Sequence, residues 1–313
     1  MIRQIFFRIL ATIPVVAIVA LLIFLMLRLS PGAPAVIMAG DSATPAEIAA
    51  IRAQLGLDQP LLLSFLKWLG GVVQGDLGTS LFAPMPVTEL IGQRLEPTLM
   101  LTLCATIFSL VVALPLGLIA GTNQGKPIDK AVMAMVVLGF SLPVFLIGYG
   151  LVRTLSIESG IFPVQGYVSI FSNPGKALMH LVLPSITVGF AYASLLARMT
   201  RSSIIEVMKQ DYIRTAKAKG LKPMVILGIH ALKNASPPII TTVGAGVAML
   251  LGGVVVTESV FAIPGLGRLT VDVVLRRDYP VIQGLLLLFS ALYFLVNLAV
   301  DILYVIVDPR VRT

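Results

Sequence analysis

Residues 97–125 decide the fold, and they read PTLMLTLCATIFSLVVALPLGLIAGTNQG. The stretch contains no Asp, Glu, Lys or Arg. A helix with about 20 apolar residues, each rising 1.5 Å, crosses the roughly 30 Å hydrocarbon core of a bilayer. We therefore expect a transmembrane helix here.

Five more uncharged intervals of similar length extend this expectation to the whole chain. They are residues 9–27, 131–152, 177–197, 234–257 and 279–300. Helices satisfy their own backbone hydrogen bonds in lipid, whereas a membrane barrel would show short alternating segments, which the sequence lacks. The sequence predicts an all-α integral membrane protein with six transmembrane helices, the first of them retained because it is too long for a signal peptide.

The composition excludes several classes of protein. The 313 residues are 57% hydrophobic and 12% charged, with a mean hydropathy of +0.98. Soluble domains have roughly 25% charged residues, so an ordinary soluble enzyme and a disordered chain are excluded. Cys104, His180 and His230 are too few for a metal cluster or a disulfide scaffold, so no metal site is expected.

The net charge of +8 is concentrated in one connection between predicted spans. Eight of the 23 lysines and arginines lie there: Arg198, Arg201, Lys209, Arg214, Lys217, Lys219, Lys222 and Lys233. Loops rich in Lys and Arg stay in the cytoplasm, so this connection and both termini are expected on the cytoplasmic side. The charge therefore indicates orientation, and no nucleic-acid partner is expected.

The spans divide the chain into three predicted parts. Residues 1–30 hold the N-terminal tail and first helix, residues 31–96 an extracytoplasmic helical insertion, and residues 97–313 a five-helix core with the cytoplasmic loop 198–236.

Within the insertion, Thr44-Pro45-Ala46-Glu47 is a capping box that opens a helix ending near Gly56. A second, apolar helix is expected from Pro60 towards Gly70-Gly71. This helix either packs at the helix ends or docks an external partner.

Prolines and glycines inside the spans predict details of their packing. Pro14, Pro115, Pro143 and Pro184 are expected to kink the helices that contain them. The Gly117-x-x-x-Gly121 spacing is typical of a close approach between two helices.

The connection 198–236 is more than a simple loop. Residues 201–219 favour a helix, which Gly220 should end by adopting a left-handed conformation. Pro223 should begin a second helix through Leu232, and Pro237-Pro238 should separate that helix from the next span.

Two interpretations of this basic corner are open from the residues alone. Exposed Ala216 and Ala218 would allow close approach to a partner's groove, with Tyr212 and Arg214 as anchors. Alternatively, the segment lies on anionic lipid headgroups as a basic amphipathic helix.

The motifs of this corner resemble a known family. DYIRTAKAKGL at residues 211–221, HALKNA at 230–235 and Pro238 resemble the cytoplasmic "EAA" loop of ABC importer permeases, most closely the dipeptide/oligopeptide/nickel family. Further matches along nearly the whole chain are LGLDQP (55–60), GDLG (75–78), RMTRSS (198–203), ESVF (258–261), PGLGR (264–268), RDYPV (277–281), VDILY (300–304) and DPR (308–310). The chain departs from the family pattern at Ala33 and Ile263.

The resemblance implies a type I ABC importer permease fold that works by alternating access. Loop 198–236 would then be a coupling loop seated in an ATPase subunit, through Asp211, Tyr212, Arg214, Thr215, Ala216, Ala218, Gly220 and Leu221. The implied partners are a second homologous permease subunit, two ATP-binding subunits, an extracytoplasmic substrate-binding protein and the lipid bilayer.

The energy source is expected to lie in the partners. The nearest approach to a P-loop, Gly125-Lys126, has Ala120 in place of the first glycine and Pro127 in place of Ser/Thr. The chain is therefore expected to have no catalytic residues and no cofactor, with ATP and Mg bound by the partner ATPases. The expected location is the prokaryotic plasma (inner) membrane.

The family implies dipeptides or oligopeptides as substrates, with glutathione, an opine or a nickel chelate as alternatives. A proton-coupled secondary transporter is a more remote alternative, because such a protein is expected to carry several carboxylates or histidines deep within its spans.

Four residues near the end of the fifth span are predicted to serve the translocation path or an external gate: Glu258, Pro264, Gly265 and Gly267. An ionisable residue near membrane depth is a functional candidate. The alternatives are that Glu258 makes hydrogen bonds at a helix end, and that the glycine-rich loop is simply a turn into a short surface helix.

Overall fold

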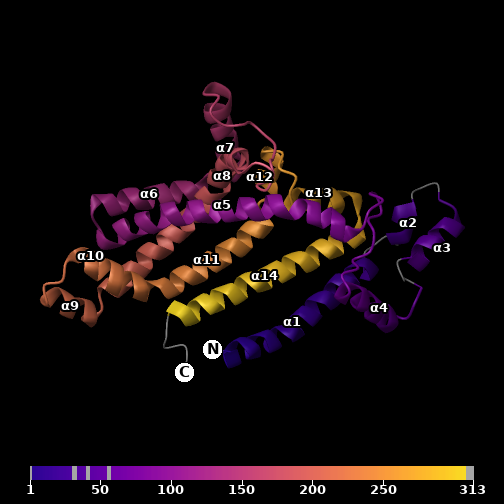
Figure 1. Cartoon of the computed structure of the whole chain (residues 1–313), viewed down its shortest axis with the longest axis horizontal. Coiled ribbons are helices and arrows are strands. Elements are labelled where there is room, and N and C mark those ends of the chain that lie inside the picture. The colour runs from indigo at the N-terminus through magenta and orange to yellow at the C-terminus, as the bar shows by residue number, and fades with distance from the viewer. Residues whose placement is uncertain (1, 30–33, 40–42, 55–57, 308–313) are drawn as a thin grey trace. The chain divides into compact units, whose positions relative to one another are not determined.

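A computed structural model describes residues 2–29, 34–39, 43–54 and 58–307 of the chain (Figure 1). The regular elements in these ranges are helices, and one isolated antiparallel bridge joins Thr79 to Pro86. Contacts divide the chain into two compact units, which are described separately. Unit 1 comprises residues 1–95 and 269–292, and unit 2 comprises residues 96–268 and 293–313.

Unit 1 contains four helices that precede the long α5. They are α1 (Ile2–Leu29), α2 (Pro34–Ala39), α3 (Pro45–Gln54) and α4 (Leu61–Val73). Aromatic rings join α1 to α4: the Phe24 centroid lies 5.3 Å from that of Phe65 and 5.7 Å from that of Trp68. The insertion helix predicted from Pro60 therefore exists and packs part of its apolar side on α1.

The predicted capping box at the start of α3 is confirmed. The backbone N–H of Thr44 donates to Glu47 Oε2 at 2.7 Å, and the Thr44 hydroxyl accepts from the Glu47 N–H at 3.4 Å. The Thr44 hydroxyl also donates to Glu47 Oε2, at 2.9 Å. The bond from the Thr44 N–H, followed by this one, lowers the pKa of Glu47. The predicted end near Gly56 and the departure at Ala33 lie outside the described residues.

The buried carboxylate of Asp278 connects two segments of unit 1 that are far apart in the sequence. The Ser80 hydroxyl donates to Asp278 Oδ2 at 2.5 Å, and the Leu81 N–H lies 3.3 Å from the same carboxylate. Asp278 immediately precedes α14 (Tyr279–Val307), so it ties the segment around the Thr79–Pro86 bridge to the start of that helix.

Unit 2 is built around the longest helices. Its elements are most of α5 (Val87–Thr122), α6 (Pro127–Ser141), α7 (Val144–Leu151), the π-helix η1 (Val152–Glu158), α8 (Pro174–Met208), α9 (Asp211–Ala218), α10 (Pro223–Val225), the π-helix η2 (Ile226–Leu232), α11 (Lys233–Gly253), α12 (Val255–Val260), the start of α13 (Leu266–Arg276) and the second part of α14.

The described residues contain four or five of the six predicted membrane-spanning helices. Within the described residues, four helices are long and apolar enough to cross a membrane: α5, α8, α14 and the continuous run Pro223–Gly252. The bent pair α6 and α7–η1 would be a fifth span. The apolar stretch described in α1, Thr12–Arg28, is shorter than these helices. The count of six spans therefore remains a prediction.

The kink predicted at Pro143 is confirmed, and it divides the predicted span 131–152 into two helices. The chain turns by 99° between α6 and α7, at Leu142-Pro143. Leu142 is extended (ψ 126°), because the residue before a proline disfavours the helical region and Pro143 has no N–H to donate. The other three prolines expected to kink spans, Pro14, Pro115 and Pro184, lie inside helices that remain continuous.

The single helix predicted over residues 201–219 is wrong. Helix α8 continues to Met208, and extended Gln210 (ψ 150°) separates it from α9.

Pro237-Pro238 do not separate two helices, because both lie inside α11. Pro237 has no N–H to donate to the Lys233 carbonyl. That carbonyl accepts a hydrogen bond from the Ser236 hydroxyl instead, at 2.6 Å. A side chain therefore replaces a missing backbone donor, and the helix continues through the prolines.

The predicted close approach at Gly117 and Gly121 is confirmed. A Cβ on Gly117 would lie 2.8 Å from the Ala197 carbonyl oxygen, and one on Gly121 would lie 2.8 Å from Ile204 Cγ2. Glycine at these positions therefore lets α5 pack directly on the backbone of α8.

Candidate functional site

The basic corner, residues 198–236, is formed by the end of α8, α9, α10 and η2. Gly220 adopts φ +75°, as the sequence predicts for a helix-ending glycine. The Gly220 N–H donates to the Lys217 carbonyl at 3.0 Å, and the Leu221 N–H donates to the Ala216 carbonyl at 3.3 Å. These two bonds form a Schellman motif, which fixes the direction in which the chain leaves α9.

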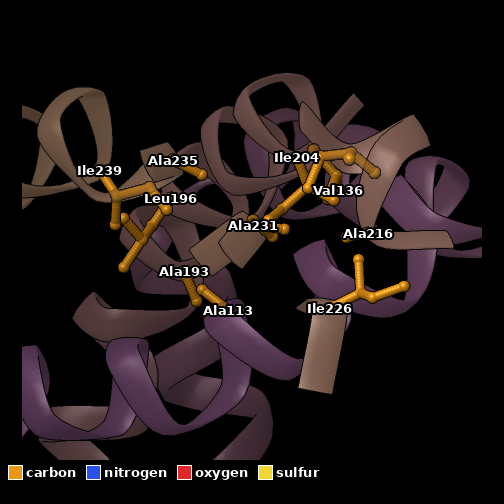
Figure 2. Close-up of a cluster of buried hydrophobic side chains, with 12 residues drawn as sticks. Ala113, Val136, Ala193, Leu196, Ile204, Ala216, Ile226, Ala231, Ala235 and Ile239 are labelled. Atoms are coloured by element: carbon orange, nitrogen blue, oxygen red, sulfur yellow. The ribbon is translucent and has the colours of Figure 1, made fainter. Parts of the chain in front are cut away.

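The inner side of α9 belongs to a buried apolar cluster (Figure 2). Ile213 and Ala216 pack there with Val136 of α6, Ile204 of α8 and Ile226 of η2. The expectation that Ala216 is exposed is wrong, because it is only 6% exposed. Ala216 lies three residues after Ile213 and so shares its inward side of the helix.

The outer side of α9 and the turn that follows it carry the other predicted corner residues. Seven of them are exposed: Asp211, Tyr212, Arg214, Thr215, Ala218, Gly220 and Leu221. Tyr212 is 42% exposed and so keeps an aromatic surface available. The corner therefore combines a rigid buried side with an exposed side of mixed charge, a tyrosine and small residues, which suits protein binding.

The second group of predicted site residues surrounds a buried carboxylate. The Glu258 side chain is fully buried. The Thr98 hydroxyl donates to Glu258 Oε1 at 2.6 Å, and the Arg268 N–H donates to Oε2 at 2.9 Å. The Thr98 oxygen in turn accepts from the Leu266 N–H at 2.8 Å.

These contacts place the carboxyl group of Glu258 at the start of α13. The first N–H groups of a helix have no partner within the helix, and its N-terminus favours an anion. Glu258 and Thr98 satisfy two of these groups. The name Glu258 clasp is used below for Thr98, Glu258 and residues 264–268.

Glycines allow the clasp to close tightly. A Cβ on Gly265 would collide with the Glu258 carboxyl group, and one on Gly267 would lie 2.9 Å from Val255 Cα. Pro264 is half-buried beside them. Ile263, the departure from the family pattern, is fully buried in a second apolar cluster of unit 2.

Sequence reasoning missed Thr98. It is separated from Glu258 by 160 positions, so no local pattern connects the two residues. The signal available was a threonine within the apolar stretch that begins at Pro97.

Helix α5 joins the two groups of residues. Thr98 lies in the clasp, and Gly121 packs against Ile204 and the Arg201 carbonyl at the corner. The rise of an α-helix over this length is roughly 35 Å, which exceeds the roughly 30 Å hydrocarbon core. The clasp and the corner therefore lie far enough apart to occupy opposite sides of a bilayer. The described residues contain no group of three His, Cys, Asp or Glu side chains that could hold a metal ion.

Comparison with known proteins identifies two matching family models. Residues 113–313 match the binding-protein-dependent transport system inner membrane component, and residues 1–102 match the N-terminal model of such membrane components.

Several curated proteins resemble the chain over nearly its full length. A probable peptide ABC transporter permease protein of Sinorhizobium fredii is 46% identical over 305 residues, covering 97% of both chains. The glutathione transport system permease protein GsiC of Salmonella paratyphi A is 42% identical over 312 residues, covering 100% of this chain and 99% of its own.

Solved structures support the fold. The inward-facing MetNI methionine ABC transporter matches with a TM-score of 0.57 and 22% identity, covering 70% of this chain and 96% of that chain. This likeness supports the predicted importer permease fold.

Proposed function

This chain belongs to the family of binding-protein-dependent transport system inner membrane components, and on that premise we propose that it forms a path for dipeptides and oligopeptides across the membrane. It is a non-catalytic permease subunit of an ABC importer and a multi-pass inner-membrane protein. Partner ATPases and a substrate-binding protein complete such importers, and ATP and Mg belong on the ATPases.

The single observation that carries the coupling role is the two-sided build of α9. Ile213 and Ala216 anchor the helix in a core shared with α5, α6, α8 and α11, while Tyr212, Arg214 and Ala218 remain exposed. A force applied to the exposed side is therefore passed to several long helices at once. This supports the proposal that loop 198–236 docks in an ATPase subunit and transmits its motion.

The orientation and the assembly are parts of the same proposal. The concentration of Lys and Arg in the basic corner supports a cytoplasmic position for the corner and for both termini. The Glu258 clasp then faces the outside, where residues 264–268 would form an external gate. We further propose residues 31–96 as an extracytoplasmic insertion, and pairing with a second homologous permease subunit.

The relatives support a peptide substrate. One is named a probable peptide permease, and another a glutathione permease, which favours glutathione as the second candidate because that relative matches the chain end to end. An opine or a nickel chelate remains a further alternative from the sequence resemblance.

The coupling proposal is tested by placing a bulky residue on the exposed side of α9. Ala218→Trp should reduce co-purification of the ATPase subunits and substrate-stimulated ATP hydrolysis in proteoliposomes. Ile157→Trp, at a 67% exposed position of η1 outside the corner, is the matched control and should leave both unchanged. Full assembly and full stimulation in Ala218→Trp would overturn the docking role of the corner.

A further inference from the structure

A second carboxylate lies on α5 two residues before Thr98 of the clasp. Glu96 Oε1 accepts three hydrogen bonds from one segment: from the Tyr167 hydroxyl at 2.9 Å, the Ser169 hydroxyl at 2.8 Å and the Ile170 N–H at 2.9 Å. Hydrogen bonds to an ionised acceptor are roughly twice as strong as neutral ones. Glu96 therefore fixes the segment between η1 and α8, residues 159–173, to α5.

The same segment is also bonded to the chain that leads into the clasp. The Gly166 N–H donates to the Phe261 carbonyl at 2.9 Å, and the Gln165 side-chain amide donates to the Val260 carbonyl at 3.3 Å. Gly166 has φ +99°, a conformation that favours glycine. The backbone at this position is therefore shaped to present its N–H to Phe261.

The chemistry of Tyr167 keeps the Glu96 contact intact. Burial, with Glu96 as the second cause, raises the pKa of Tyr167 far above its ordinary value. The phenol therefore stays protonated and remains a donor throughout the physiological pH range.

We propose that Glu96 is a positioning residue of the external gate: it locks residues 159–173 to the Glu258 clasp, so that the two segments open and close as one body. The inference rests on the proposed function, in which the clasp faces the outside. Glu258 holds one segment to α5 and Glu96 holds the other. The bonds from Gln165 and Gly166 to the residues 260–261 connect the two segments directly.

The first test measures the relative position of the two segments in the assembled importer. In a Cys104→Ser background, spin labels are placed at Phe171, which is 86% exposed, and at exposed Ser259. We expect a narrow distance distribution in both the resting and the ATP-trapped states. Glu96→Ala should broaden this distribution in both states. A distribution that stays narrow in Glu96→Ala would overturn the proposal.

The second test measures coupling in proteoliposomes. Glu96→Ala removes all three hydrogen bonds and should lower substrate transported per ATP by about tenfold or more, because losing even one charge-assisted hydrogen bond changes an equilibrium about tenfold. Glu96→Gln keeps an acceptor oxygen and should recover part of the loss. Glu158→Ala is the matched control, because Glu158 is exposed and pairs only with exposed Arg153 among the described contacts.

The controls separate this inference from the proposed function. If Thr98→Val lowers coupling but Glu96→Ala does not, the clasp is the gate and the role of Glu96 is wrong. If neither variant changes coupling, the external gate itself is wrong. Should Glu96→Ala fail to assemble, the double variant Tyr167→Phe/Ser169→Ala removes two donors from the other side and must show the same broadening.

Discussion

Arg201 of α8 donates two hydrogen bonds to Asp129 of α6, from Nε to Oδ1 at 2.5 Å and from Nη2 to Oδ2 at 2.7 Å. The Asp129 side chain is only 4% exposed, and its Oδ2 also accepts from the Gly125 N–H at 2.8 Å. The turn that joins α5 to α6 is thereby fixed to α8 beside the basic corner. Helices α6 and α8, which both contribute to the buried cluster that holds α9, are thus also connected by this ion pair.

Breaking this pair should be costly. Because removal of Arg201 leaves the Asp129 carboxylate with only the Gly125 N–H as a donor, Arg201→Gln should lower the free energy of unfolding in detergent by about 1–3 kcal/mol. The charge-swapped double variant Asp129→Arg/Arg201→Asp should recover part of that loss. Arg214→Gln removes the exposed partner of Asp211 and should cost less than about 1 kcal/mol. Equal effects of Arg201→Gln and Arg214→Gln would contradict a structural role for the buried pair.

Two glycines of α11 should respond differently to the same methyl group. A Cβ on Gly246 would collide with the ring of Tyr192, whose hydroxyl is held by the Val243 carbonyl at 2.9 Å, whereas a Cβ on Gly252 would meet no atom within 4 Å. Gly246→Ala should therefore destabilise the protein by about 1–3 kcal/mol. Gly252→Ala should be neutral or slightly stabilising, because alanine favours helix. Thermal unfolding in the same detergent measures both.

Tyr304 should stabilise α11 at its prolines. The Tyr304 hydroxyl donates to the Pro237 carbonyl at 2.8 Å and also contacts the Thr241 hydroxyl. Tyr304→Phe should lower the free energy of unfolding by about 0.5–1.5 kcal/mol, the usual net value of one hydrogen bond. Tyr293→Phe, at a 59% exposed position of α14, the helix that also carries Tyr304, should have no measurable effect on the free energy of unfolding. The interpretation fails if the two variants are equally stable.

Competition for uptake should identify the substrate. In cells that carry the complete importer, unlabelled dipeptides and tripeptides should reduce uptake of a labelled dipeptide in proportion to their binding-protein affinity. Glutathione, an opine and a nickel chelate should compete weakly. Strong competition by glutathione alone would reverse the assignment within the family.

The sequence by itself determined several features that depend on neighbouring residues. The uncharged stretches, the Thr44–Glu47 capping box and the left-handed Gly220 were all predicted, because helix ends are set by hydrogen bonds that reach only a few residues along the chain. The family was also readable, since its motifs are short and recur in order along the sequence.

Only the tertiary structure decided which sides of the helices face each other. It turned Ala216 inward, and it let the chain continue as one helix through Pro237-Pro238. It also joined Thr98 to Glu258 and Asp129 to Arg201 across long sequence separations. The physical reason is that a buried carboxylate must find donors wherever packing brings them. Local propensity cannot specify these partners, because they depend on how the long helices pack.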